Sequence, residues 1–87
     1  MIEIETGKLL GTVSHYYSRI GVAVVEVVDA LKIGDTIRIV GGANTDFTQA
    51  VESMEIEHEK IEEAKAGDSI GLKVDQKARE GYKVYRA

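Results

Sequence analysis

The sequence predicts an all-β fold, a six-stranded closed β-barrel with one short helical turn, and three observations lead to this prediction. Val, Ile and Thr make up 24 of the 87 residues, and β-branched side chains favour pleated, half-buried strands. The nine glycines are distributed along the chain between short apolar runs, which is typical of strands joined by tight turns. No long segment carries a convincing helical pattern.

Six segments have the character of strands. Gly11 interrupts the first and predicts a β-bulge or a close backbone approach. Gly34 lies in a turn, where it can adopt positive φ without a Cβ clash. In the third segment, Ile37 and Ile39 should point inward and Arg38 outward. The expected strands are 9–14, 22–28, 36–40, 47–58, 70–75 and 82–85.

The segment 47–58 changes phase along its length. Apolar residues occupy odd positions up to Val51 and even positions from Met54. A strand with a period of two residues cannot switch faces without an inserted residue. We therefore expect a β-bulge near Glu52 and Ser53, and His58 to be partly buried on the same parity as Met54.

The remaining segments complete the predicted architecture. Residues 61–66 favour a single helical turn that ends at Gly67. Six short strands bury both their apolar face and their edges best when the sheet closes into a barrel. An open sandwich is the alternative. At 87 residues, the whole chain 1–87 is expected to form one domain.

Charge and composition exclude several classes of protein. The formal net charge is −4, and the segment 52–63 alone carries six Glu and one Lys, so strong non-specific nucleic-acid binding is not expected. The chain has no Cys, which removes disulfides and thiolate chemistry. No apolar run approaches the roughly 20 residues that span a bilayer. We expect a cytoplasmic protein with no membrane partner.

Four motifs occur in order along nearly the whole chain, from about residue 8 to residue 85. They are G-T-V at 11–13, L-K-I-G-D-T-I at 31–37, V-E-S-M-E-I-E-H-E at 51–59, and I-E-E-A-K-A-G-D-S-I-G-L-K-V at 61–74. This series resembles the second domain of translation elongation factors, elongation factor Tu and its archaeal and eukaryotic counterpart. The segment 11–23 is closer still to the accessory C-terminal barrel of collagenase-like peptidases, relatives associated with RNA modification. Both resemblances imply a Greek-key β-barrel.

The resemblance to elongation factor Tu also implies positions for a binding pocket. Glu55 matches the acidic residue that packs against the terminal adenosine of charged tRNA. Ser69 stands where that family has Asn, and Glu57 where it often has His, so two of the three positions differ. The chain has no G-x-x-x-x-G-K-[ST] phosphate loop. No bound nucleotide or other cofactor is expected.

The residues themselves suggest little chemistry. If 47–58 is one strand, Glu55, Glu57 and Glu59 project from one face at intervals of roughly 6.6 Å. Such a row suits a basic partner or a hard cation such as Ca²⁺, or it is a solvated face paired with neighbouring lysines. His58 has no second His one helical turn away, and no Ser lies in a G-x-S-x-G context. We predict no catalytic residue, no metal site and no enzyme activity.

The segment 15–19 holds the strongest candidate for a binding loop. Tyr16 and Tyr17 stand beside His15 and Arg19, a combination that stacks unpaired bases or anchors a protein partner. Alternatively, one Tyr closes the end of the barrel and the other is ordinary surface. Arg38 would extend such a patch. The candidate partner-binding residues are His15, Tyr16, Tyr17, Arg19, Arg38, Glu55, Glu57 and Ser69.

The sequence leads to one leading hypothesis of function and two alternatives. The leading hypothesis is a non-catalytic binding module that docks on RNA, on the ribosome or on a translation or RNA-modifying protein. The first alternative is a protein–protein adaptor without RNA contact that uses its acidic strand against a basic partner. The second is a small-molecule barrel of the flavin-binding kind, for which the sequence offers no arginine cluster.

Overall fold

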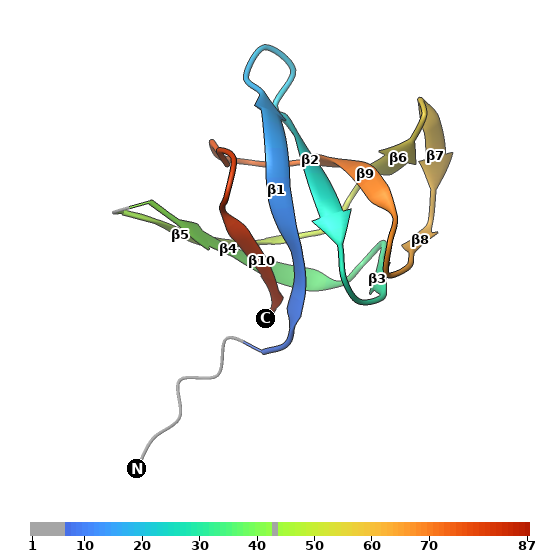
Figure 1. Ribbon diagram of the computed structural model, residues 1–87, viewed down its shortest axis with the longest axis horizontal. Coiled ribbons are helices and arrows are strands. Elements are labelled where there is room, and N and C mark those ends of the chain that lie inside the picture. The colour runs from blue at the N-terminus through green and yellow to red at the C-terminus, as the bar shows by residue number, and fades with distance from the viewer. Residues whose placement is uncertain (1–6, 43) are drawn as a thin grey trace.

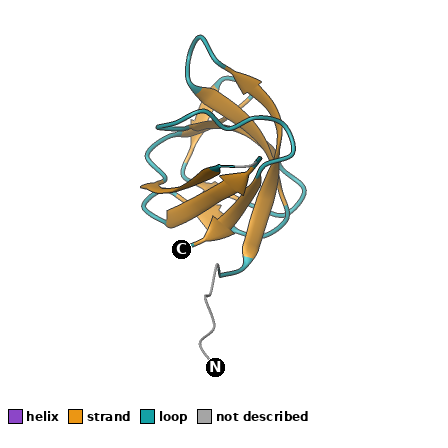
Figure 2. Ribbon diagram, turned by 90° about the vertical axis from the view of Figure 1, so that its left-hand side faces the viewer, coloured by secondary structure: helices purple, strands orange, loops and turns teal. Residues whose placement is uncertain are grey.

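The computed structural model describes residues 7–42 and 44–87, and this part of the chain is all β with no helix (Figures 1 and 2). Ten strands are found in it, where the sequence predicted six. They are β1 (Leu9–Tyr17), β2 (Val22–Val27), β3 (Leu31–Lys32), β4 (Thr36–Gly41), β5 (Thr45–Ala50), β6 (Met54–Ile56), β7 (Glu59–Ile61), β8 (Glu63–Ala64), β9 (Ser69–Lys73) and β10 (Lys83–Arg86).

Eight of these strands form one antiparallel sheet that curls around the core (Figure 2). Their order is β5-β4-β10-β1-β2-β9-β6-β7, and β3 and β8 form a separate two-stranded sheet. The first and last strands, β1 and β10, are therefore neighbours in the middle of the sheet. No strand pair in the described residues joins β5 to β7, so the predicted closure into a barrel is not confirmed, whereas the all-β class is.

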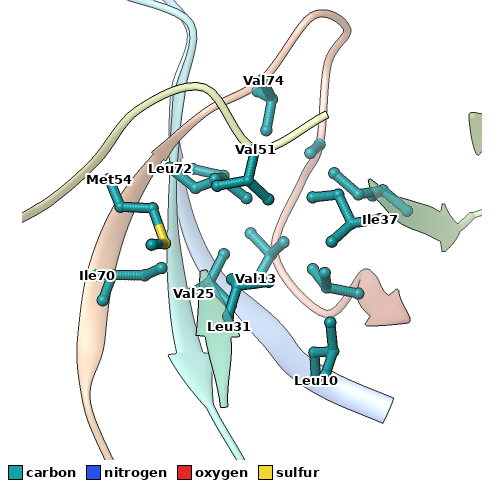
Figure 3. Packing of buried hydrophobic residues seen from close by; sticks show 14 of the residues in the cluster. Leu10, Val13, Val25, Leu31, Ile37, Val51, Met54, Ile70, Leu72 and Val74 are labelled. Atoms are coloured by element: carbon teal, nitrogen blue, oxygen red, sulfur yellow. The ribbon is translucent and has the colours of Figure 1, made fainter. Parts of the chain in front are cut away.

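The core lies on the concave side of this sheet. Side chains from strands on either side of β1, such as Ile37 on β4 and Ile70 on β9, point toward a common centre (Figure 3). Arg38 lies on the other face of β4, as the alternation predicted. Because each fully buried Leu or Ile contributes about 1.5–3 kcal/mol, this shared interior holds the curled sheet together.

Gly11 confirms the expected irregularity in β1. The pairing of β1 with β10 shifts register between Leu9 and Gly11. A Cβ atom built on Gly11 would stand 2.6 Å from Cγ1 of Val25 and 2.7 Å from the carbonyl oxygen of Glu26. Only glycine allows β2 to approach β1 this closely.

The segment 47–58 is not one bulged strand. β5 pairs with β4, whereas β6 pairs with β9 and β7, so the chain leaves one part of the sheet and joins another at residues 51–53. The phase change is real: Val51 and Met54 are both buried. Its cause is a change of neighbours, because each strand turns its own apolar side to the core.

The predicted helical turn at 61–66 is also absent. Ala64 on β8 is opposite Leu31 on β3, and both side chains are fully buried. The backbone N–H of Ile33 donates to the carbonyl of Glu62 at 3.0 Å. These tertiary contacts override the local helix preference of the Glu-Glu-Ala-Lys-Ala run.

The side chain of Gln49 connects β5, at one end of the sheet, with the end of β9 and the residues that follow it. Its Nε2 donates to the carbonyl of Lys73 at 2.8 Å, and its Oε1 accepts from the backbone N–H of Asp75 at 2.7 Å. Gln49 is 7% exposed. The amide thus acts as a bridge between β5 and the segment that follows β9, where no strand pair is made.

A two-residue turn joins β6 to β7. Ile56 is opposite Glu59, and the two residues between them, Glu57 and His58, have φ values of 50° and 70°. Positive φ at both central positions is the mark of a type I′ hairpin turn, which favours Asn-Gly. His58 is exposed, so the prediction that it is partly buried is wrong.

This turn yields a stability prediction. Replacing Glu57 and His58 together by Asn and Gly should raise the free energy of unfolding by about 1 kcal/mol, because it relieves two side chains held at positive φ. Urea denaturation measures the change. Glu57→Val is the opposite control and should lower stability, since a β-branched residue resists this conformation. Equal stabilities for all three proteins would contradict the turn.

Candidate functional site

The tip of the β1–β2 hairpin projects beyond the sheet and is drawn as the light blue loop in Figure 1. We call residues 15–20 the tip. The predicted loop begins inside a strand, because β1 continues through Tyr17. A register shift between Val13 and His15 opposite β2 places Tyr16 against the core. Tyr17 and Ile20 are left 49% and 60% exposed.

Two aromatic rings are in contact within the tip. The centroids of the His15 and Tyr17 rings lie 4.4 Å apart at an interplanar angle of 66°, an edge-to-face arrangement. Such pairs contribute about 0.5–1.5 kcal/mol beyond the area they bury. The hairpin end is further fixed by the N–H of Gly21, which donates to the carbonyl of Tyr17 at 2.9 Å.

A concave surface that we call the apolar groove, about 520 Å³ in volume, lies on one side of the tip. Val22 and Val24 contribute to its apolar lining. Ile70 and Gly71 of β9 border it as well, although the Ile70 side chain is buried in the core. Tyr17 and Ile20 from the tip also line it, as do Glu55, Glu57, His58 and Ser69. Large exposed apolar side chains beside a hollow are typical of a docking surface.

The groove thus brings together four of the eight predicted binding residues: Tyr17, Glu55, Glu57 and Ser69. Ser69 is fixed by its hydroxyl, which donates to Oε2 of Glu26 at 2.8 Å. The expected row of three glutamates on one strand is not formed. Glu57 lies in the turn, and Glu59 lies on β7, opposite Ile56.

A second concave surface, about 600 Å³ in volume, lies beside the same tip. We call it the basic hollow. It is lined by two predicted residues, His15 and Tyr16, and by Ser18, Lys77, Arg79 and Glu80. Sequence reasoning missed Lys77 and Arg79. The sequence feature that could have indicated them is the pair of cations on either side of Ala78, in the loop between β9 and β10.

The two predicted arginines lie in different surroundings. Arg19 lies in the tip. Its neighbours in sequence are Ser18, which lines the basic hollow, and Ile20, which lines the apolar groove. The Arg19 side chain makes no ion pair in the described residues. Arg38 lies on β4, two strands from β1, and binds Asp46 through Nε at 2.7 Å and Nη2 at 2.6 Å. These hydrogen bonds lower the pKa of the Asp46 carboxyl below its ordinary value.

The described residues contain no group of three or more His, Asp or Glu side chains placed to hold a metal ion. They also include no helix long and apolar enough to cross a membrane.

Comparison with known proteins places the sequence beside peptidases. No protein-family model matches the chain. The chain is 41% identical over 76 residues to an uncharacterized protease of Methanocaldococcus jannaschii. It is 39% identical over 72 residues to a collagenase of Porphyromonas gingivalis. These stretches cover 87% and 82% of this chain but only 19% and 20% of the relatives, so the chain spans about a fifth of their length.

Solved structures show the same fold. The crystal structure of the C-terminal domain of a putative U32 peptidase from Geobacillus thermoleovorans matches with a TM-score of 0.86, and the match covers 99% of each chain at 20% identity. Its selenomethionine variant gives the same TM-score over 91% of this chain at 21% identity.

These comparisons correct the functional prediction. The prediction of a translation-factor-like module that docks on RNA is wrong, because the relatives are named as a protease and a collagenase and the structural neighbour is a U32 peptidase domain. The alternative of a protein–protein adaptor is wrong as well, because the row of Glu55, Glu57 and Glu59 on one strand is not formed. Of the two resemblances seen in the sequence, the findings support the collagenase-like accessory barrel and not the translation factors.

Proposed function

We propose that this chain is a non-catalytic accessory domain of a collagenase-like U32 peptidase, and that the apolar groove docks on the catalytic part of such a protein. The observation that supports this most is the match to an isolated U32 C-terminal domain over 99% of each chain. The 41% identity to a protease over nearly the whole of this chain points to the same assignment.

The catalytic part of the relatives is the occupant that best suits the groove. The curated relatives carry about four-fifths of their length outside the matched region, and this remainder is the partner that a docking surface on the matched region has in the same chain. Interfaces between domains combine an apolar centre with a polar rim. In the groove, Val22 and Val24 provide apolar surface beside Tyr17 and Ile20 of the tip, and Glu55 and Ser69 provide polar groups.

A segment exchange in the Porphyromonas gingivalis collagenase tests the proposal. Four proteins are compared: the native collagenase, one without the matched segment, one with this chain in its place, and one with the Ile20→Ser chain. Collagen cleavage is measured. We expect the deletion to lower activity and this chain to restore most of it. Ile20→Ser should lower the restored activity about tenfold, since a buried apolar anchor contributes more than 1 kcal/mol to an interface.

Val28→Ser provides the matched control. Val28 is 53% exposed, compared with 60% for Ile20, and it does not line the groove. The Val28→Ser chain should restore activity as well as the unchanged chain. If the exchanged protein is folded by circular dichroism but inactive, the accessory role is contradicted. If Ile20→Ser and Val28→Ser behave alike, the groove is not the docking surface.

A further inference from the structure

The basic hollow shares no lining residue with the apolar groove, and it goes beyond the proposed docking on a peptidase. Its cationic wall comes from the loop between β9 and β10, and its other wall comes from the tip. On the side of the tip, His15 and Tyr16 are paired with Val24 and Ala23 of β2. The loop lies outside the strands, so it is held by a few specific contacts.

The cationic wall is tied firmly to the body of the fold. Ala78 is fully buried in the core, whereas Lys77 and Arg79 on either side of it are exposed. The N–H of Gly81 donates to the carbonyl of Val13 at 2.8 Å, and the N–H of Tyr82 donates to the carbonyl of Arg79 at 3.2 Å. The buried alanine therefore acts as an anchor that directs both cations outward.

These cations differ from others of the protein in having no acidic partner. Arg38 is paired with Asp46, Arg86 with Asp35 and Lys8 with Asp29. In the described residues no ion pair engages Lys77 or Arg79, although Glu80 is part of the same lining. Two unpaired cations at one hollow of a chain with net charge −4 form a local positive field that attracts an anion.

The opposite wall supplies further polar groups. Tyr16 is half-buried and packed against the core, which holds its ring in place beside the hollow. Tyr16, Ser18 and His15 all line the space, and their side chains carry two hydroxyls and an imidazole. Hydroxyl and guanidinium donors together suit a carboxylate, because Arg binds it with two parallel hydrogen bonds and the hydroxyls satisfy the remaining lone pairs.

We propose that the basic hollow binds an acidic polypeptide segment through its side-chain carboxylates. Residues 77 and 79 are two positions apart, so their Cα atoms are at most about 7 Å apart. Carboxylates at alternate positions of an extended peptide recur at nearly the same interval. A nucleic acid fits less well, because its affinity requires many cations along the phosphate backbone and this hollow offers two beside a glutamate.

Fluorescence anisotropy tests the proposal with a fluorescein-labelled peptide of alternating Gly and Glu, in low salt. Its matched counterpart has Gln in place of every Glu. We expect the Glu peptide to bind and the Gln peptide not to bind. Arg79→Gln should weaken the Glu peptide about tenfold, the loss of one bidentate charged contact. Lys77→Gln should weaken it about threefold, the loss of one single charged contact.

The control is Lys65→Gln, which changes the net charge by the same amount at an exposed position outside both hollows. It should leave the affinity unchanged. Amide NMR shifts on titration should be confined to the tip and residues 77–81. An equal loss from Lys65→Gln and Arg79→Gln would show mere net-charge attraction and overturn the site. Tighter binding of a labelled oligouridine than of the Glu peptide would overturn the choice of ligand.

Discussion

Replacing Gln49 by Met should lower the free energy of unfolding by about 2–3 kcal/mol. The Met side chain has a similar volume, so packing is retained while both hydrogen bonds across the sheet are lost. The backbone N–H of Asp75 and the carbonyl of Lys73 then remain without these partners, and each such group costs about 1–3 kcal/mol when water cannot reach it. Urea denaturation with a constant m-value measures the loss.

Gln49→Glu separates the bridge from simple packing. The carboxylate keeps an acceptor for the N–H of Asp75 but turns its other oxygen toward the carbonyl of Lys73. Burial and this repulsion raise the pKa of the new carboxyl in the folded state above its unfolded value. The variant should therefore be least stable at neutral pH and should regain stability as the pH falls through the raised pKa, where the protonated group donates again.

The matched control is Gln76→Met, since Gln76 is the other glutamine of the chain and is exposed. It should change stability by less than about 0.5 kcal/mol. If Gln49→Met is equally mild, or if Gln49→Glu becomes less stable on acidification, the side-chain bridge is not a significant contact.

Gly11→Ala should cost about 2–3 kcal/mol. The added methyl group would overlap both Cγ1 of Val25 and the carbonyl oxygen of Glu26, and overpacking of this kind costs about 1–3 kcal/mol. A carbonyl oxygen held in the ladder cannot move without disturbing the β1–β2 pairing. Thermal and urea unfolding both measure the effect.

A double variant identifies which contact dominates. Val25→Ala removes the side-chain overlap but leaves the carbonyl of Glu26 in place. The cost of Gly11→Ala, measured against the Val25→Ala protein, should therefore be reduced only in part. Gly71→Ala is the control in the same sheet, because its nearest neighbour, Cγ1 of Val22, would be 3.4 Å away. It should be nearly neutral. Full rescue by Val25→Ala would contradict the backbone argument, and a mild Gly11→Ala would contradict the close approach itself.

The sequence predicted those features that depend on local pattern. Alternation placed Ile37 and Ile39 in the core and Arg38 outside, and the missing Cβ of Gly11 indicated a close approach. The corner at 51–53 was misread as a bulge, because apolar parity shows which side of a strand is buried but not which strand is its neighbour. For the same reason, the pairing of Ala64 with Leu31, 33 positions earlier, was not foreseen.

The candidate site divides along the same line. Tyr16 and Tyr17 were conspicuous because aromatic residues in a turn region are unusual. Lys77 and Arg79 were not conspicuous in the sequence, because two cations in a loop do not indicate a binding site by themselves. Only the burial of Ala78 shows that both side chains lie at the surface. The groove could not be predicted either, since it needs residues from the tip, from β9 and from the β6–β7 turn. Side chains this far apart in sequence meet only through the order of strands.

The position of β10 in the sheet has a consequence for how the protein folds during its synthesis. The strand occupies residues 83–86 yet separates β4 from β1 at the centre of the sheet. During synthesis, β4 and β1 cannot be joined through the sheet until residues 83–86 have left the ribosome. Pairing between strands so far apart in sequence makes folding slow. Until β10 is in place, β4 and β1 each present an unpaired strand edge, and chaperones bind nascent chains with such edges.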